Sequence, residues 1–227
     1  MPARSKEPFN YFQDRFKQIS ESHCGPAVIQ MQLSLHGLDV RQEQVAEAGG
    51  ASSLIEMNGM RVDQLARAVR RLAPHLRFYY KERATLDDLV RIVADYRYPV
   101  GVEWQGVFED EDAARYDRAN SAWKPSPPES PLLPLDSESS DSDYGHYSLV
   151  TGVNRRKRLL TVADPYKDFY SRARIFDFDL FDRRWYDYNE VPDPVTGGVR
   201  LVMDDHLMFV ITRPGALFPR KLGMVTF

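Results

Sequence analysis

The sequence predicts an α+β fold in which a helical N-terminal half packs on an antiparallel sheet. Helix-period patterns of apolar residues dominate the first hundred residues, whereas short runs rich in β-branched and aromatic residues dominate after residue 145. The chain has 227 residues, of which 43% are hydrophobic, and this is enough to bury one sizeable core. We therefore expect one domain that spans residues 1–227.

Three segments of the first half have the pattern of amphipathic helices. The first covers residues 26–36, where a leading proline suits a first helical turn and the following Gly37 suits the C-terminal end. The second covers residues 62–72 and stops before Pro74. The third covers residues 85–93, and its first residue, a threonine, is an expected N-cap.

Short β-rich runs separate and follow these helices. They cover residues 76–80, 98–104, 147–153, 159–162, 199–203 and 207–211. The third and fourth runs predict a hairpin with its tip at the basic segment 154–158, which we expect to be a solvated turn. The aromatic and acidic segment 175–188 is either a helix or a wrapped loop. Its aromatic residues are expected mainly in the core, with one or two lining a substrate cleft.

Charge and cysteine content exclude several classes of protein. The net charge is −3, so no overall positive field attracts nucleic acid or an anionic membrane, and a peptide or protein substrate is the expected partner. The single cysteine, Cys24, excludes an internal disulfide and a cysteine-rich zinc site. No apolar run has the length of a signal peptide core or of a membrane span. We expect a cytoplasmic protein, and the sequence leaves its oligomeric state open.

Two segments lie apart from the predicted elements. Residues 1–17 are expected to form an N-terminal extension. Residues 124–143 are rich in Pro, Ser, Asp and Glu and predict a flexible acidic insert. Because this insert ends three residues before His146, it is a candidate lid or self-inhibitory strap for a site at that histidine.

Cys24 is the candidate nucleophile. Acyl transfer by a thiol needs a thiolate, a base that holds the proton, and donors directed at the developing oxyanion. A position at the start of a helix favours the ionised sulfur, because the helix dipole and unsatisfied N–H groups lie beside it. Gly25 removes side-chain bulk where a substrate must approach. Gln18, six residues before the cysteine, is expected to direct its side-chain amide to the same oxyanion as the Cys24 N–H.

His146 and Asp164 are the candidate base and its orienting group. His146 opens one strand of the predicted hairpin, and Asp164 follows the other. The hairpin therefore brings the two residues side by side. In that geometry the Asp164 carboxylate accepts a hydrogen bond from one imidazole nitrogen, so that the other nitrogen faces Cys24.

These residues resemble a known family. The matching pieces are Gln18-x5-Cys24-Gly25-Pro26-Ala27, then Gly145-His146-Tyr147-Ser148-Leu149-Val150 with Gly152-Val153, then Asp164-Pro165, with a weaker echo in Trp185. The pattern is similar to that of the papain-like cysteine peptidases that clip double-glycine leaders from bacteriocin precursors and are usually fused to ABC exporters. The resemblance implies a papain-like fold and the same roles for Gln18, Cys24, His146 and Asp164. We expect a standalone domain without an exporter, with Gly25, Gly145 and Tyr147 at the substrate site.

Two other histidines need separate interpretations. His23 adjoins Cys24, but neighbours in sequence at a helix start point apart, so we expect His23 on the exposed rim rather than in the role of base. His206 follows two aspartates, but no second histidine or cysteine stands at ligand spacing. We therefore predict a polar turn there, and no metal.

The predicted reaction is hydrolysis of a peptide bond without a cofactor. Cys24 attacks the carbonyl, His146 protonates the leaving amine, and water releases the acyl group. Two alternatives remain open: an acyltransferase that passes the same thioester to an amine or thiol, and a catalytically silent module that holds a peptide. An intact set of four residues argues against the silent module.

Overall fold

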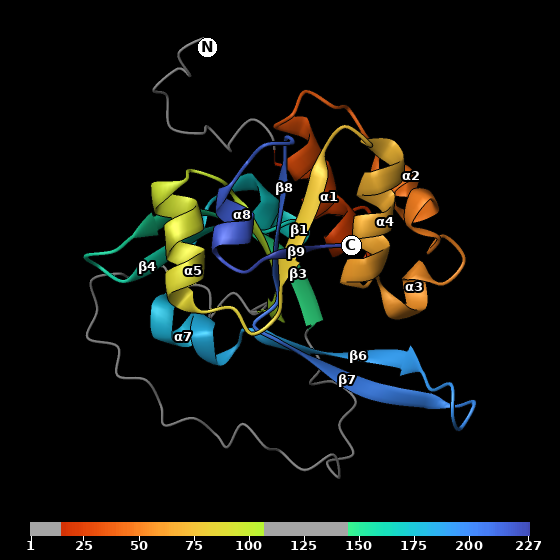
Figure 1. The fold of residues 1–227 in the computed structure, drawn as a ribbon. Helices are drawn as coiled ribbons and strands as arrows, with labels where there is room; N and C mark the ends of the chain where they lie inside the picture. The colour runs from red at the N-terminus through yellow and green to blue at the C-terminus, as the bar shows by residue number, and fades with distance from the viewer. Residues whose placement is uncertain (1–14, 107–144) are drawn as a thin grey trace.

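The structure is a computed structural model that describes residues 15–106 and 145–227 (Figure 1). The predicted insert at 124–143 and most of the predicted extension at 1–17 lie outside the described residues. Helices lie on both sides of a central antiparallel sheet, and a separate two-stranded ribbon projects from one end (Figure 1).

Helices occupy much of the first half of the described chain, as predicted. They are α1 (Cys24–Ser34), α2 (Gln42–Gly49), α3 (Ile55–Asn58), α4 (Val62–Leu72) and α5 (Leu86–Val90), which continues as a π-helical turn over Arg91–Asp95. The first helix begins two residues earlier than predicted, because Pro26 lies in its first turn, where a backbone N–H is not needed. The sequence pattern did not indicate α2 or α3, since both are short and have few large apolar residues.

The start of α5 confirms the predicted threonine cap. Thr85 Oγ1 accepts a hydrogen bond from the Asp88 backbone N–H at 3.1 Å, and the Asp88 carboxylate accepts one from the Thr85 backbone N–H at 3.0 Å. This reciprocal pair satisfies two backbone donors that a helix start leaves without carbonyl partners.

The main sheet has seven strands in the order β5-β4-β3-β2-β8-β1-β9, and all neighbouring pairs are antiparallel. Its strands are β1 (Arg77–Lys81), β2 (Val100–Gln105), β3 (Gly145–Asn154), β4 (Leu159–Ala163), β5 (Arg174–Asp177), β8 (Met208–Thr212) and β9 (Val225–Thr226). Five of the six β-rich runs predicted from the sequence lie in this sheet. The remaining run, residues 199–203, lies in β7 (Val199–Asp205), one strand of the separate two-stranded ribbon.

The ribbon consists of β6 (Tyr186–Pro192) and β7 (Val199–Asp205), paired antiparallel and separate from the main sheet. The prediction of a helix or a wrapped loop over 175–188 was therefore incomplete. This segment contains most of β5, all of α7 (Phe178–Arg183) and the start of β6. Three short elements in fourteen residues obscure any single periodicity. Short helices also cover Lys167–Ser171, which is 3₁₀, and α8 (Phe218–Lys221).

Each face of the main sheet has its own helical layer and apolar cluster. On one face α1, α2 and α4 pack on a cluster that includes Leu149. On the other face α5, α7 and α8 pack on a cluster that includes Val150. These neighbours on β3 point to opposite faces, as strand geometry requires. No helix in the described ranges is long and apolar enough to cross a membrane.

The predicted hairpin is confirmed as β3 and β4. Leu149 pairs with Ala163, so Asp164, directly after β4, comes close to the start of β3. The tip at 154–158 is exposed, and Arg158 there pairs with Asp179 at 2.5 Å. The hairpin thus brings His146 and Asp164 together where β3 begins and β4 ends, close to Cys24 at the start of α1.

Candidate active site

Cys24 is the first residue of α1, at the helix start where it was predicted. Its side chain is 8% exposed. The N–H groups of a first helical turn lack carbonyl partners within the helix, and the dipole makes this end partially positive. Both effects favour a negative charge on the sulfur.

His146 and Asp164 form a hydrogen-bonded pair, as the hairpin predicted. His146 Nε2 lies 2.8 Å from Asp164 Oδ1. Because an ionised carboxylate can only accept, Nε2 carries a proton, and Nδ1 is the ring nitrogen left for the Cys24 thiol, which hydrogen-bonds the imidazole. Asp164 Oδ1 also accepts from the Tyr166 backbone N–H at 3.0 Å. The imidazole orientation is therefore set by a carboxylate that is itself held by the backbone.

Arg174 is a further member of this group. It pairs with Asp164 Oδ2, and its guanidinium lies 3.8 Å from the ring centroid of Phe169 and 4.9 Å from that of Phe176. Arg174, Asp164 and His146 are each 3% exposed or less. Sequence reasoning missed Arg174, although a basic residue directly before the aromatic segment 175–188 was an available signal.

The electrostatics of the group favour a charged imidazole. Burial lowers the pKa of His146, but the charge and hydrogen bond of Asp164, together with Cys24, outweigh it and raise this pKa to about 9. Burial alone would raise the pKa of Asp164, but His146, Arg174 and the Tyr166 N–H lower it below its usual value. The raised pKa of His146 and the lowered pKa of Asp164 agree, because both favour an ion pair of imidazolium and carboxylate at neutral pH.

Gln18 lies in the segment before Cys24 but uses its amide locally. Its Nε2 donates to the backbone carbonyls of Ser20 at 2.8 Å and Glu21 at 3.0 Å. Its backbone N–H donates to the Pro165 carbonyl at 2.9 Å, which links this segment to the residue after Asp164. Both amide hydrogens thus support the turn that leads into α1, and neither is directed at an oxyanion in this structure.

Two of the three residues expected at the substrate site are buried, and the third is exposed. Gly25 is buried, and a Cβ there would lie 3.2 Å from atoms of Leu65 and Tyr147. Tyr147 is 4% exposed and belongs to the apolar cluster under α1. Gly145 is exposed, and a Cβ there would lie 2.5 Å from the Asp187 carboxylate. Gly25 and Tyr147 thus pack closely at the start of α1, and the missing side chain of Gly145 allows the close approach of Asp187.

The other two histidines of interest each lie within hydrogen-bond distance of a residue nearby in the sequence. His23 is 6% exposed, so the prediction of an exposed rim position was wrong. Its Nδ1 lies 2.6 Å from Ser20 Oγ, within the turn that Gln18 supports. His206 connects β7 and β8 and lies 2.5 Å from Asp205. Within the described ranges, no three His, Cys, Asp or Glu side chains are grouped to hold a metal ion.

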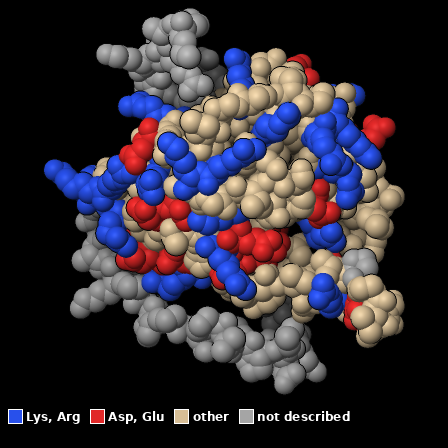
Figure 2. Space-filling view, viewed as in Figure 1, with Lys and Arg blue, Asp and Glu red and all other residues tan. Residues whose placement is uncertain are grey.

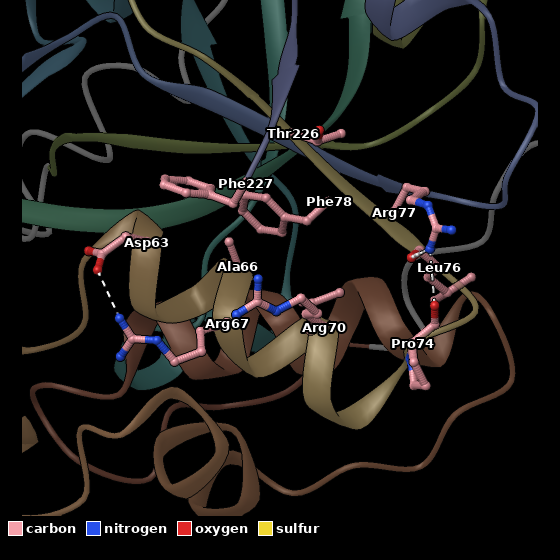
Figure 3. Close-up of a pocket in the computed structure, with 11 residues that line it drawn as sticks. Asp63, Ala66, Arg67, Arg70, Pro74, Leu76, Arg77, Phe78, Thr226 and Phe227 are labelled. Atoms are coloured by element: carbon pink, nitrogen blue, oxygen red, sulfur yellow. Dashed lines mark hydrogen bonds and ion pairs between the residues drawn. The ribbon is translucent and has the colours of Figure 1, made fainter.

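A cavity of about 550 Å³ lies elsewhere, between α4 and the edge of the sheet at β1 and β9 (Figure 3). Phe78 and Phe227 line its apolar side, and arginines from α4 and β1 lie around it. Lysine and arginine side chains gather over this part of the surface (Figure 2). Arg77 donates to the Pro74 and Leu76 carbonyls, so its guanidinium is already engaged. None of the four predicted catalytic residues lines this cavity.

Comparisons with known proteins agree with this arrangement. A family model described as "Peptidase_C39 like family" matches residues 11–192. The crystal structure of the peptidase domain of Streptococcus ComA, a bi-functional ABC transporter involved in a quorum sensing pathway, is similar to this structure with a TM-score of 0.50 and 14% sequence identity. The match covers 88% of this chain and 97% of that chain, and it confirms the predicted fold class. No curated protein matches the chain.

Proposed function

Since the chain belongs to the peptidase C39-like family and is a papain-like cysteine peptidase, we propose that it cleaves peptide bonds with Cys24, His146 and Asp164. The observation that carries this assignment is the buried hydrogen bond of 2.8 Å between His146 Nε2 and Asp164. That bond leaves the other imidazole nitrogen for the thiol. An imidazole so oriented, beside a thiol at a helix start, is the arrangement that activates a cysteine.

In the proposed reaction His146 is an imidazolium that already holds a proton at Nδ1, and the Cys24 thiolate beside it attacks the peptide carbonyl carbon. The tetrahedral intermediate collapses as the C–N bond breaks, and His146 gives its proton to the leaving amine. Water then attacks the thioester, His146 accepts a proton from it, and the carboxylic acid product leaves. Asp164 stays ionised throughout and holds the imidazolium.

The oxyanion of both intermediates needs hydrogen-bond donors. The Cys24 backbone N–H is one candidate. We assign Gln18 as the second, which requires its amide to turn from the carbonyls of Ser20 and Glu21, 2.8 and 3.0 Å away, when a substrate carbonyl enters. A peptide with paired glycines before the cleaved bond, the substrate of the leader peptidases that the sequence resembles, is the first substrate to try.

The first experiment measures activation of the thiol directly. Cys24 is the only cysteine, so its alkylation by iodoacetamide between pH 5 and 9 is followed by intact mass. We expect rapid labelling well below the ordinary thiol pKa of about 8.5, and loss of this rapid phase in His146→Ala. His23→Gln is the matched control, because His23 adjoins the thiol but bonds Ser20, and it should leave the profile unchanged.

Two results would count against the assignment. Slow labelling that rises only near pH 8.5 in all three proteins would make Cys24 an ordinary thiol. If His23→Gln loses the rapid phase and His146→Ala keeps it, the base that activates Cys24 is His23 and not His146. Hydrolysis is separated from acyl transfer by adding a primary amine during turnover, since a transferase forms the amide of that amine.

A further inference from the structure

The ribbon formed by β6 and β7 has two chemically different faces. Antiparallel register places Asp187 opposite Asp204 on one face and Tyr188 opposite Met203 on the other. Because side chains alternate along a strand, each face contains every second residue. The first face is polar near its root, whereas the second has a row of apolar side chains.

The polar face anchors the ribbon to β2. Gln105 Nε2 donates to Asp187 Oδ1 at 2.9 Å. Asn189 Nδ2 donates to Glu103 Oε1 at 3.3 Å and to Asp204 Oδ2 at 2.9 Å. Glu103 is 1% exposed, and burial followed by the charges of Asp187 and Asp204 raises its pKa well above the usual value. A protonated Glu103 removes its repulsion with the Asp187 and Asp204 carboxylates in this contact.

The same face reaches the strand that contains His146. The Asp187 carboxylate lies so close to Gly145 that a Cβ there would be 2.5 Å away. Gly145 directly precedes His146 in β3. The root of the ribbon is thus fixed at the residue before the candidate base, and the rest of the ribbon extends away from the body of the protein (Figure 1).

The apolar face is exposed along this extension. The exposed fractions are 41% for Tyr188, 50% for Met203, 49% for Leu201 and 64% for Val199. Single exposed apolar residues are ordinary, but a continuous row on a projecting element indicates an interaction site. In the described part of the chain each ribbon strand pairs only with the other, so each has one edge without strand partners. An extended peptide can add to such an edge.

We propose that this apolar face of the ribbon binds the peptide substrate of Cys24 as an extended strand with apolar side chains at alternate positions. This inference rests on the proposed function. The substrate is the occupant because the root of the ribbon contacts Gly145, the residue before His146, so a strand bound along the apolar row ends close to the candidate active site. Glu190, exposed on the same face, disfavours acidic side chains between the apolar ones.

The length of the row sets a requirement on the substrate. Val199 to Met203 spans four residue steps, or about 13 Å at the rise of an antiparallel strand. A peptide that fills this row therefore extends by about four residues beyond those at the cleaved bond. Shorter peptides reach the thiol but not the whole row.

The test measures peptide binding without cleavage. A fluorescein-labelled ten-residue peptide that alternates valine or leucine with threonine or lysine is titrated with the Cys24→Ser protein, and fluorescence anisotropy is recorded. We expect Leu201→Ser combined with Met203→Ser to raise Kd at least tenfold, because two apolar contacts are lost. Arg200→Ser, on the same strand but the opposite face, is the matched control and should change Kd less than twofold.

A scrambled peptide of the same composition, with its apolar residues three and four apart, should bind at least tenfold more weakly. Equal affinity for the two peptides, or an unchanged Kd in the double variant, would overturn the proposal. A shift from dimer to monomer in the double variant without a change in Kd would identify a second copy as the occupant and also overturn it.

Failure of this proposal differs from failure of the proposed function. Iodoacetamide labelling of Cys24 is measured on the ribbon variants that retain the cysteine. If Cys24 is labelled rapidly and this depends on His146, but the two peptides bind equally well, the ribbon site is rejected and the cysteine mechanism stands. Absence of rapid labelling in the unchanged protein would reject the cysteine mechanism on which the ribbon site rests.

Discussion

The β3–β4 hairpin and the β6–β7 ribbon are both antiparallel strand pairs near the candidate active site, but the hairpin is mostly buried and the ribbon is largely exposed. The hairpin lies inside the main sheet between β2 and β5 and holds a buried charged group at one end. The ribbon stands outside the sheet, is anchored through one face near its root, and exposes apolar side chains on the other.

This difference separates two physical requirements of a peptidase. The base that holds a proton must keep a fixed position, and burial of the His146–Asp164 hydrogen bond fixes the imidazole. A substrate must be reached from solvent, and in our proposal the anchored but projecting ribbon supplies that access. We therefore expect substitutions in the hairpin group to affect stability and those on the ribbon to affect binding.

The largest effect is expected from Arg174→Ala. It leaves the buried Asp164 carboxylate without its guanidinium partner and should lower the free energy of unfolding by about 3–5 kcal/mol, measured by urea denaturation. The control is Arg158→Ala, which removes an ion pair whose partners are 55% and 61% exposed. That change should cost at most about 1 kcal/mol. Equal losses in the two variants would show that burial does not distinguish the hairpin group.

The pH dependence of stability should follow from the same group. The pKa of His146 rises to about 9 in the folded protein, so between its ordinary value of 6.5 and 9 the folded state binds more protons than the unfolded state. Stability from this group is thus fully present below pH 6.5 and lost as pH rises to 9, by about 3 kcal/mol in total. Asp164, with a lowered pKa, contributes stability above pH 3.8 that is lost on further acidification.

Thermal unfolding of the unchanged protein and His146→Ala, from pH 5 to 9.5, measures this contribution. The difference in stability should shrink steadily across the alkaline half of the range. A difference that is independent of pH would mean that the pKa of His146 is the same in the folded and unfolded states, so that no ion pair raises it.

A smaller effect is expected where the two regions meet. Gly145→Ala places a Cβ 2.5 Å from the Asp187 carboxylate and should lower the free energy of unfolding by about 1–3 kcal/mol. Asp187→Ala in the same chain should relieve most of this clash, so the double variant should lose less than the sum of the single losses. Additive losses in a double-mutant cycle would show that Asp187 and Gly145 are not coupled.

The smallest effect is expected on the exposed face of the ribbon. Leu201→Ser should change the free energy of unfolding by no more than about 0.5 kcal/mol, because the side chain is 49% exposed. A loss above 2 kcal/mol in urea would indicate that this face is covered in the folded protein. The comparison between hairpin and ribbon would then fail.

Local patterns predicted what depends on neighbours in the chain. The helix at 62–72, the threonine cap at 85 and the β3–β4 hairpin were evident because periodicity, caps and turns act over a few residues. The hairpin also predicted the contact between His146 and Asp164, since pairing two strands fixes which of their ends meet.

The sequence by itself thus determined three of the helices, six of the strands, the helix start at Cys24, and the pairing of histidine with aspartate. Only the tertiary structure decided that Arg174 supports Asp164, that Gln18 bonds its own turn, that His23 is buried and that β6 and β7 leave the main sheet. These features depend on packing between segments distant in sequence. A side chain's burial and partners there follow from the whole fold, whereas periodicity and turn chemistry follow from neighbouring residues.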